Sequence, residues 1–496
     1  MTRLRRPPPT ERRLLAPGLA VCSLLAACTM GPDYRRPEVQ VPERWQPSPV
    51  VAEQPPPGKV ELLDTAWWAA FGDPQLDALI RVALEENKDL RIAALRVEQY
   101  NAQLQVAQSQ GGPQAVARGQ RTRDSVSQNR FIPVAGGAYP VGNTYEIGAG
   151  VTWEIDFWGR VRRANEAALA DLTATEEDRR ALVLSLVANV ASTYVTLLGL
   201  DRELELHRLA AASRQESVQL LGKKLEGGGV GEQPYLKAKA EYEEALAELT
   251  VREAEITLIE HALSSLLGRS PDRIERGKTL ASLNLPPIPA GLPADLLVQR
   301  PDVRKAEQEL VSANARIGIA KAQYLPTIGL TAQYGFASAE LNTLLQSSSN
   351  VSSFGAILLG PIFTSGRIAG QVREAEAIQQ QKAIAYLLSV QTALREVEDA
   401  LVLHRQTWQR SAIRARQLEA LRAHARSALK RYEGGRSSYL EVLDADRDTY
   451  VGEVQQNQTR RDQYIALISV YKAMGGGWSV SESPLVAPTA KATTNE

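Results

Sequence analysis

Residues able to do chemistry are few in this sequence and lie apart from one another. The 496-residue chain has four histidines, which fall far apart within predicted helices: His207, His261, His404 and His424. None stands at the spacing of an H-E-x-x-H zinc motif or of a His/Cys ligand pair. The glycine-rich run at residues 227–231 follows a predicted helix and lacks the Lys-Ser/Thr pair of a phosphate-binding loop. We therefore expect no catalytic residue, no metal site and no nucleotide cofactor, and predict that the protein is not an enzyme.

Cysteine chemistry is confined to the N-terminus, at Cys22 and Cys28. An arginine-rich leader and an apolar stretch at residues 14–27 precede Cys28, the pattern of a secretory signal. Residues 25–28, Leu-Ala-Ala-Cys, resemble the lipobox of bacterial lipoproteins. The resemblance implies a signal peptide at 1–27 and a Cys28 that carries S-diacylglycerol and N-palmitoyl groups, with ordinary cleavage as the alternative. By the same resemblance, Thr29 in place of Asp favours sorting to the outer membrane.

The charge balance argues against one large class of partners. Lys plus Arg and Asp plus Glu both total 57, so the chain has no overall basic field to gather nucleic acid. Residues 28–60 are rich in proline and cannot hold a helix. We predict an acylated strap there, and a disordered tail at residues 476–496.

The sequence contains an internal repeat, which dictates its architecture. Gly159 corresponds to Gly366 at a separation of 207 positions (366 − 159), and the same separation relates motifs as far as residue 475. Upstream, Pro113 corresponds to Pro326 at a separation of 213 (326 − 113), so a six-residue length change (213 − 207) is confined to one loop. The predicted domains are repeat 1 at 61–270, a linker at 271–292 and repeat 2 at 293–475.

Each repeat is predicted to hold a helix, two short strands, a very long helix, a glycine break and a further helix. The long helices and those after the breaks are predicted at residues 160–226, 232–268, 367–433 and 438–474. A helix of roughly 65 residues would reach on the order of 100 Å, and its apolar residues step by three and four as in a coiled coil. Residues 181–200 carry no charge, but their copy in repeat 2 is charged. We interpret them as a buried interface, not as a transmembrane helix.

Clear alternation predicts two strands, at about 144–153 and 327–337, and weaker alternation predicts two more, at about 114–124 and 351–359. One face of the two clearest segments is apolar and predicted to meet lipid: Ile147, Val151, Trp153, Ile328, Leu330, Tyr334 and Phe336. The opposite face is small or polar, which is typical of a membrane barrel strand around a wet lumen. A half-buried hairpin on a soluble sheet has the same pattern and is the alternative.

Four strands cannot close a barrel alone, because the smallest single-chain barrels have about eight strands. A sheet in lipid cannot leave an open edge either, since each unpaired backbone group costs several kcal/mol there. The barrel must therefore be shared, and geometry allows two, three or four chains. Since each long helix continues from a strand, the helices must form a second, coaxial tube.

Nearly the whole mature chain resembles the outer-membrane efflux proteins of the TolC and OprM type. The motifs are Gly-Pro-Asp-Tyr-Arg-Arg-Pro at 31–37, Trp-Trp at 67–68, Phe-Gly-Asp-Pro at 71–74, Arg-Pro-Asp-Val at 300–303, Gly-Pro-Ile-Phe at 360–363, Tyr-Glu-Gly-Gly at 432–435 and Tyr-Leu-Glu-Val-Leu-Asp-Ala at 439–445. The resemblance implies a mainly α fold with a small membrane β part. In it, two tandem repeats of coiled-coil helices form a trimer with a twelve-strand β-barrel in the outer membrane and a periplasmic α-helical tunnel.

The same resemblance implies partners and a role. A periplasmic adaptor and a proton-driven inner-membrane pump would dock to the tunnel, and the chain would passively conduct drugs or other small toxic compounds outward. An outer-membrane duct for protein secretion is a rival within the class. A periplasmic coiled-coil scaffold that forms no pore is a rival from another class, but it leaves the alternating strands without a reason.

The family closes its periplasmic tip with inward-packed helix pairs and acidic rings, and the matching positions here are Glu441 and Asp444. Three residues apart, they lie on one helix face. A structural alternative is that Ser438 and Glu441 form a capping box after the glycine break. The first repeat has Pro234 and Lys237 at the equivalent places, so each chain would supply one acidic set.

Glycine pairs mark the predicted tip in both repeats: Gly227, Gly228, Gly434 and Gly435. By resemblance, the adaptor docks where they break the helices. Simple helix termination, by residues that accept positive φ, is the alternative.

Overall fold

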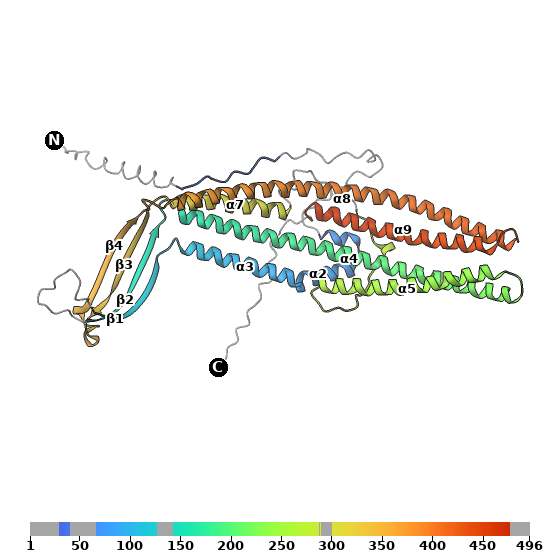
Figure 1. Cartoon of the computed structure of the whole chain (residues 1–496), viewed down its shortest axis with the longest axis horizontal. Coiled ribbons are helices and arrows are strands. Elements are labelled where there is room, and N and C mark those ends of the chain that lie inside the picture. Colours follow the sequence, from blue (N-terminus) through green and yellow to red (C-terminus); the bar gives the residue numbers. More distant parts are fainter. Residues whose placement is uncertain (1–28, 40–65, 126–141, 287, 289–299, 477–496) are drawn as a thin grey trace, which may run out of the picture. The chain divides into compact units, whose positions relative to one another are not determined.

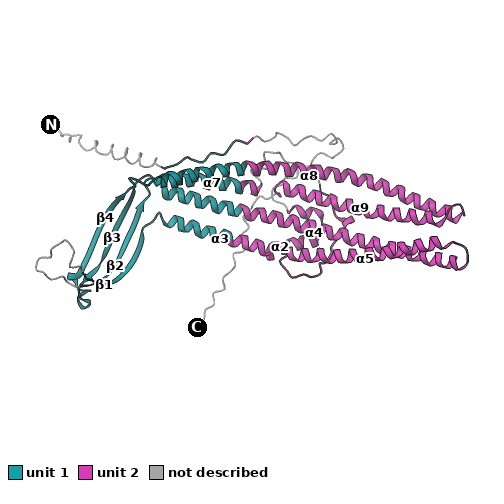
Figure 2. Cartoon of the chain, viewed as in Figure 1, with its two compact units in different colours: residues 1–38, 96–176, 305–386 teal, residues 39–95, 177–304, 387–496 magenta. Residues whose placement is uncertain are grey.

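The computed structural model describes residues 29–39, 66–125, 142–286, 288 and 300–476. The predicted signal peptide, with Cys28, lies outside the described residues, as do most of the strap and almost all of the tail. The chain divides into two compact units, shown in Figure 2. Unit 1 comprises residues 1–38, 96–176 and 305–386, and unit 2 comprises 39–95, 177–304 and 387–496.

Unit 1 contains a four-stranded antiparallel sheet with the order β1-β2-β3-β4 (Figure 1). Its strands are β1 (Gln114–Asp124), β2 (Gly142–Ile155), β3 (Thr327–Ser338) and β4 (Asn350–Leu359). They lie where the alternation predicts them, and β2 extends two residues beyond the predicted segment at each end. The central pair, β2 and β3, comes from different repeats, and its register pairs Trp153 with Leu330.

The helices repeat with the spacing seen in the sequence. They are α2 (Pro74–Glu86), α3 (Lys88–Ser109), α4 (Arg160–Glu226), α5 (Glu232–Leu266), α7 (Pro301–Ala322), α8 (Arg367–Glu433) and α9 (Tyr439–Ala473). Short 3-10 turns occur at η2 (Trp67–Phe71), η3 (Leu280–Ser282), η5 (Leu341–Thr343) and η6 (Ser347–Ser349). Both α4 and α8 have 67 residues, about 100 Å of helix, and both begin in unit 1 and end in unit 2.

The apolar stretch of α4 lies in the core of unit 2, as the sequence predicts for a buried interface. Val190, Tyr194 and Leu197 are completely buried there. Among the described helices, α4 has the length and composition to cross a membrane, and 56% of its apolar window is buried within the protein. Trp67 stacks on Tyr471 of α9, with ring centroids 5.1 Å apart.

Two of the recognised motifs have structural roles. Asp73 caps α2 by accepting from the backbone N–H of Gln75 at 3.0 Å, and it also accepts from the hydroxyl of Tyr194 at 2.9 Å. Arg300, at the start of α7, pairs with Asp302 at 2.6 Å and Glu396 at 2.7 Å. The first motif thus joins α2 to α4, and the second joins α7 to α8, all within unit 2.

Candidate functional site

The register of the sheet gives it two chemically different faces. Cross-strand partners point to the same face, and Ile147 pairs with Phe336, Ala149 with Tyr334 and Ile155 with Ile328. All seven residues predicted to meet lipid therefore lie on one face. All seven are exposed or half-buried in the single chain, including Trp153 at 39% exposure and Tyr334 at 61%, as expected of a face that packs against an apolar environment outside the chain.

The opposite face contains a close approach of two glycines. Gly148 pairs with Gly335 across β2 and β3. A Cβ atom at Gly335 would lie 2.4 Å from the Ile147 carbonyl oxygen, and one at Gly148 would lie 2.7 Å from that of Tyr334. Only glycine lets the two strands approach this closely without local movement.

Both outer edges of this sheet lack a partner strand among the described residues. Strand β1 pairs only with β2, and β4 pairs only with β3. β1 is eleven residues long and β4 is ten, and β4 is exposed along nearly its whole length. Long unpaired edges are pairing sites for another chain, and in lipid they must be filled.

The tip of unit 2 contains two equivalent helix ends. Gly228 and Gly435 both have φ of +68°, and a Cβ atom at either would meet nothing within 4 Å. The N–H of Gly229 bonds the Lys224 carbonyl at 2.7 Å, and that of Arg436 bonds the Arg431 carbonyl at 2.8 Å. These are Schellman C-caps, so the second glycine of each pair terminates its helix by backbone conformation. Docking of an adaptor at these glycines stays a prediction.

Asp444 forms an ion pair with its counterpart from the other repeat. Its Oδ1 accepts from Lys237 Nζ at 2.6 Å, and the two residues are 207 positions apart (444 − 237). Arg447 lies 3.4 Å from the same carboxylate. The pair joins α5 to α9, but both side chains are over one-third exposed, so it contributes at most about 1 kcal/mol. The internal repeat showed that Lys237 stands at the position equivalent to Asp444, but it did not predict that these two side chains would form an ion pair.

Glu441 lies at the start of α9, where Ser438 caps the helix. The Ser438 hydroxyl oxygen accepts from the N–H of Leu440 at 3.0 Å, not from that of Glu441 as a capping box requires. The Glu441 carboxylate instead lies 3.6 Å from Arg431 Nη1, at the end of α8. Ser438 thus caps α9, as the structural alternative predicts. The predicted capping box between Ser438 and Glu441 does not form, because the Glu441 carboxylate lies near Arg431 of α8. Each gate candidate has a basic partner within its own chain.

Further contacts join the two repeats at this tip. The Lys224 ammonium contacts the Tyr432 hydroxyl, and the Ser217 and Tyr439 hydroxyls lie 2.9 Å apart. Below them, Leu221, Ala238 and Leu443 form a small buried cluster. The tip is therefore held by polar contacts and a small apolar contact, both of modest energy.

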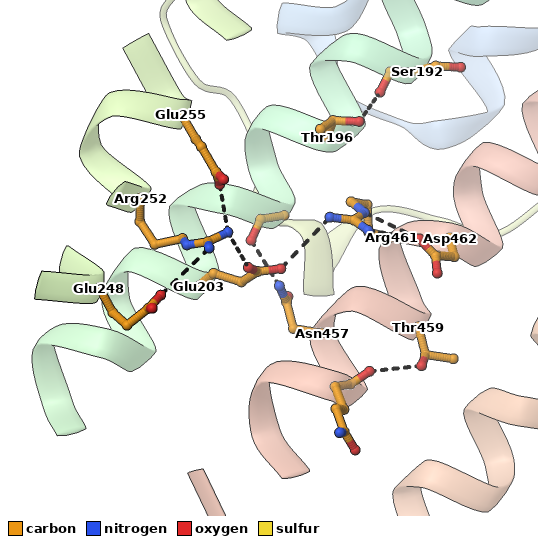
Figure 3. Close-up of polar contacts among 12 residues, drawn as sticks. Ser192, Thr196, Glu203, Glu248, Arg252, Glu255, Asn457, Thr459, Arg461 and Asp462 are labelled. Carbon is orange, nitrogen blue, oxygen red and sulfur yellow. Dashed lines mark hydrogen bonds and ion pairs between the residues drawn. The ribbon is translucent and has the colours of Figure 1, made fainter. Parts of the chain in front are cut away.

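A polar cluster joins three helices further along unit 2 (Figure 3). The carboxylate of Glu203 on α4 is 1% exposed and lies between Arg252 of α5, at 3.6 Å, and Arg461 of α9, at 3.9 Å. Burial raises the pKa of Glu203, while Arg461 opposes the shift. The Asn457 amide donates to the Gly199 carbonyl at 2.8 Å, which fixes α9 against α4. Sequence reasoning missed this cluster, because its members come from distant positions.

The histidines lie apart, as predicted. His207 and His404 are buried, and burial lowers the pKa of each. His207 contacts the Tyr450 hydroxyl at 2.5 Å, whereas His261 and His424 are exposed. In the described part of the chain, no group of three or more His, Cys, Asp or Glu side chains could hold a metal.

The N-terminal segment lies along α4 and α7 within unit 1. Arg163 of α4 pairs with Asp33 at 2.7 Å. Arg36 donates two hydrogen bonds of 2.6 Å to the buried carboxylate of Glu307 on α7. A paired charge of this bidentate geometry is among the stronger polar contacts available to a protein. The residues that follow Cys28 are thus fixed along α4 and α7 by ion pairs.

Comparison with known proteins identifies the class. The fold matches the crystal structure of the open state of the Neisseria gonorrhoeae MtrE outer membrane channel, with a TM-score of 0.80, 31% identity and coverage of 91% of this chain and 98% of that one. The protein is an outer-membrane channel of the efflux type. Residues 79–269 and 292–476 match the family described as outer membrane efflux protein, so the chain belongs to that family.

Curated relatives agree with the family assignment. The toluene efflux pump outer membrane protein TtgI of Pseudomonas putida is 34% identical over 468 residues, which cover 93% of this chain and 97% of the relative. The cation efflux system protein CusC of Escherichia coli is 32% identical over 464 residues, with coverage of 92% and 97%. The protein is therefore an outer-membrane component of an efflux system.

Proposed function

We propose that three copies of this chain close a twelve-strand barrel and a helical tunnel that passively conducts small toxic compounds outward. The observation that carries the proposal is the four-stranded sheet, whose outer edges have no partner strand in the described part of the chain. Pairing of β1 with β4 of the next copy fills both edges at once. Geometry permits two to four copies, and resemblance to the family favours three.

The proposed partners are a periplasmic adaptor and a proton-driven inner-membrane pump, which supplies the energy because the duct itself has no catalytic role. Relatives named as toluene and cation efflux components favour small molecules over exported proteins as cargo. Deletion of the gene should sensitise the host to toxic compounds, and plasmid expression should restore resistance. Restored secretion of a protein, without restored resistance, would indicate the protein-exporting role.

The proposed membrane anchor is Cys28, acylated with S-diacylglycerol and N-palmitoyl groups. Support comes from the next residue, Thr29, which packs so closely on Gly159 that a Cβ atom there would lie 2.4 Å from the Thr29 methyl carbon. Gly159 stands between β2 and α4, where the sheet gives way to helix. A lipid on Cys28 would therefore start at the base of the proposed barrel. Palmitate labelling should be lost in Cys28→Ser and retained in Cys22→Ser.

The proposed gate is the tip of unit 2, held shut by the ion pairs of Glu441 and Asp444. The double substitution Glu441→Gln with Asp444→Asn removes both acids and leaves Arg431 and Lys237 without their partners. We predict a higher single-channel conductance in planar bilayers and a weaker preference for cations. Glu453→Gln is the control, because it breaks the pair with Arg422 further along α8 and α9. Equal conductance of the double variant and the wild type would exclude a gate at these acids.

A further inference from the structure

The apolar face of the sheet ends in two arginines. Arg121 pairs with Tyr145, and Arg123 pairs with Asn143, at the end of the sheet away from α3 and α4. By the two-residue period of a strand, both arginines lie on the face that carries Ile147 and Phe336. The preceding row of that face is Gly119, Ile147 and Phe336, so the basic residues begin where the apolar band stops.

These two arginines have no carboxylate partner among the residues that the structure describes. The acids nearest in the register, Asp124 and Glu146, fall on the opposite face by the strand period. At the other end of the sheet, arginines are paired: Arg160 contacts Glu154 at 2.9 Å.

One of the two guanidinium groups packs on an aromatic ring, and both are exposed. Arg121 lies over the ring of Tyr145, with its Cζ atom 5.6 Å from the ring centroid, so one face of the guanidinium packs on the ring. Arg121 and Arg123 are exposed and two residues apart, about 7 Å along the strand. Guanidinium groups bind phosphate with two parallel hydrogen bonds.

We infer that Arg121 and Arg123 bind the phosphate groups of an anionic glycolipid in the outer leaflet of the outer membrane. The inference rests on the proposed barrel, in which the helices lie in the periplasm and this end of the sheet reaches the outer leaflet. The acyl chains pack on the apolar band, while the phosphates meet the arginines at its border. Asn143 and Ser338, on the same face, are placed to bond sugar hydroxyls.

The test is retention of lipid by the purified protein. Wild type and Arg121→Gln/Arg123→Gln are reconstituted with bis-phosphorylated lipid A, dephosphorylated lipid A or phosphatidylglycerol, and bound lipid is measured by native mass spectrometry. Each arginine near an anionic surface contributes about fivefold, so the double variant should retain bis-phosphorylated lipid A about 30-fold less. Arg118→Gln is the matched control, because Arg118 lies on the same strand but on the opposite face.

Further samples in the same experiment test the inference against misfolding and against other lipids. Arg121→Lys/Arg123→Lys should restore most of the retention, which would show that the loss does not come from misfolding. Equal retention by wild type and the double glutamine variant, or of lipid A with and without phosphate, would overturn the inference. Preference for phosphatidylglycerol would overturn the glycolipid assignment. Bilayer conductance of the same samples distinguishes the glycolipid site from the proposed barrel. If the wild type conducts but retains no lipid A, the glycolipid site is wrong and the barrel stands. If the wild type never inserts into the bilayer, the barrel itself is wrong.

Discussion

At the scale of single residues, the charged side chains of unit 2 connect helices that are distant in sequence. Glu203 is the clearest case, because one buried carboxylate contacts arginines from α5 and α9 (Figure 3). Its neighbours have other partners: Arg252 pairs with Glu255 at 2.6 Å, and Arg461 pairs with Asp462 at 3.0 Å. If Glu203 were lost, Arg252 and Arg461 would each keep one carboxylate partner but lose the buried one.

We predict that Glu203→Ala destabilises the folded protein by about 2 kcal/mol, below the full cost of breaking an isolated buried pair. Glu203→Gln should keep most of that stability, since burial favours the neutral form of this residue. Denaturant unfolding of detergent-solubilised protein measures both. Glu205→Ala is the control, because Glu205 lies two residues away with 59% of its side chain exposed. A Gln variant as unstable as the Ala variant would show that the negative charge is required.

The same residue gives a pH dependence with a definite sign. Since the folded state raises the pKa of Glu203, it binds this proton more tightly than the unfolded chain does. The stability of wild type relative to Glu203→Gln should therefore fall as the pH rises from about 4.3, the ordinary glutamate value, through the raised pKa. A rise over that interval would contradict the assignment. Parallel unfolding series at stepped pH provide the measurement.

Sequence reasoning was least informative at this scale. Gly228 and Gly435 could be predicted as helix breaks, because positive φ is a local property. The pairing of Asp444 with Lys237 could not, since it depends on how two helical hairpins pack. The structural alternative for Glu441, a capping box with Ser438, came from a local rule and is wrong, because a basic side chain on α8 is the partner of Glu441.

At the scale of elements, periodicity was a sufficient guide. The helices α4 and α8 begin and end 207 positions apart, as the repeat requires (367 − 160 and 433 − 226). Strands β2 and β3 follow from clear alternation of apolar and polar residues, whereas the alternation of β1 and β4 is weak although both strands form. The sequence did not predict the order of the strands or the pairing of β2 with β3 from different repeats. Register between segments far apart in the chain depends on how the chain folds as a whole.

The glycine pair of β2 and β3 gives a prediction at this scale. Gly335→Ala should weaken the sheet, because the new methyl group would meet the Ile147 carbonyl oxygen at 2.4 Å and force the strands apart. A fall in the temperature at which the oligomer dissociates on gels is expected. Gly119→Ala is the control, since a Cβ atom there would meet nothing within 4 Å. Equal effects of the two substitutions would mean that the glycine pair is not a point of close strand approach.

At the scale of the whole molecule, one chain leaves surfaces exposed that a folded protein normally covers. Within the described residues, its sheet has two open edges, and one face of that sheet is apolar and exposed. Large exposed apolar residues also recur on the long helices, as with Leu258 at 65% and Trp408 at 46%. A single copy would leave all these groups in contact with water or lipid without a partner, which supports assembly with further copies.

Closure of the sheet by other copies is the central claim, and the mass of the detergent-solubilised particle tests it most directly. Light scattering corrected for bound detergent should give three copies of the mature chain. Variants with one cysteine on β1 and one on β4 should form β1–β4 disulfides only between different chains. A monomer that stays soluble without detergent, or β1–β4 disulfides within one chain, would contradict the account.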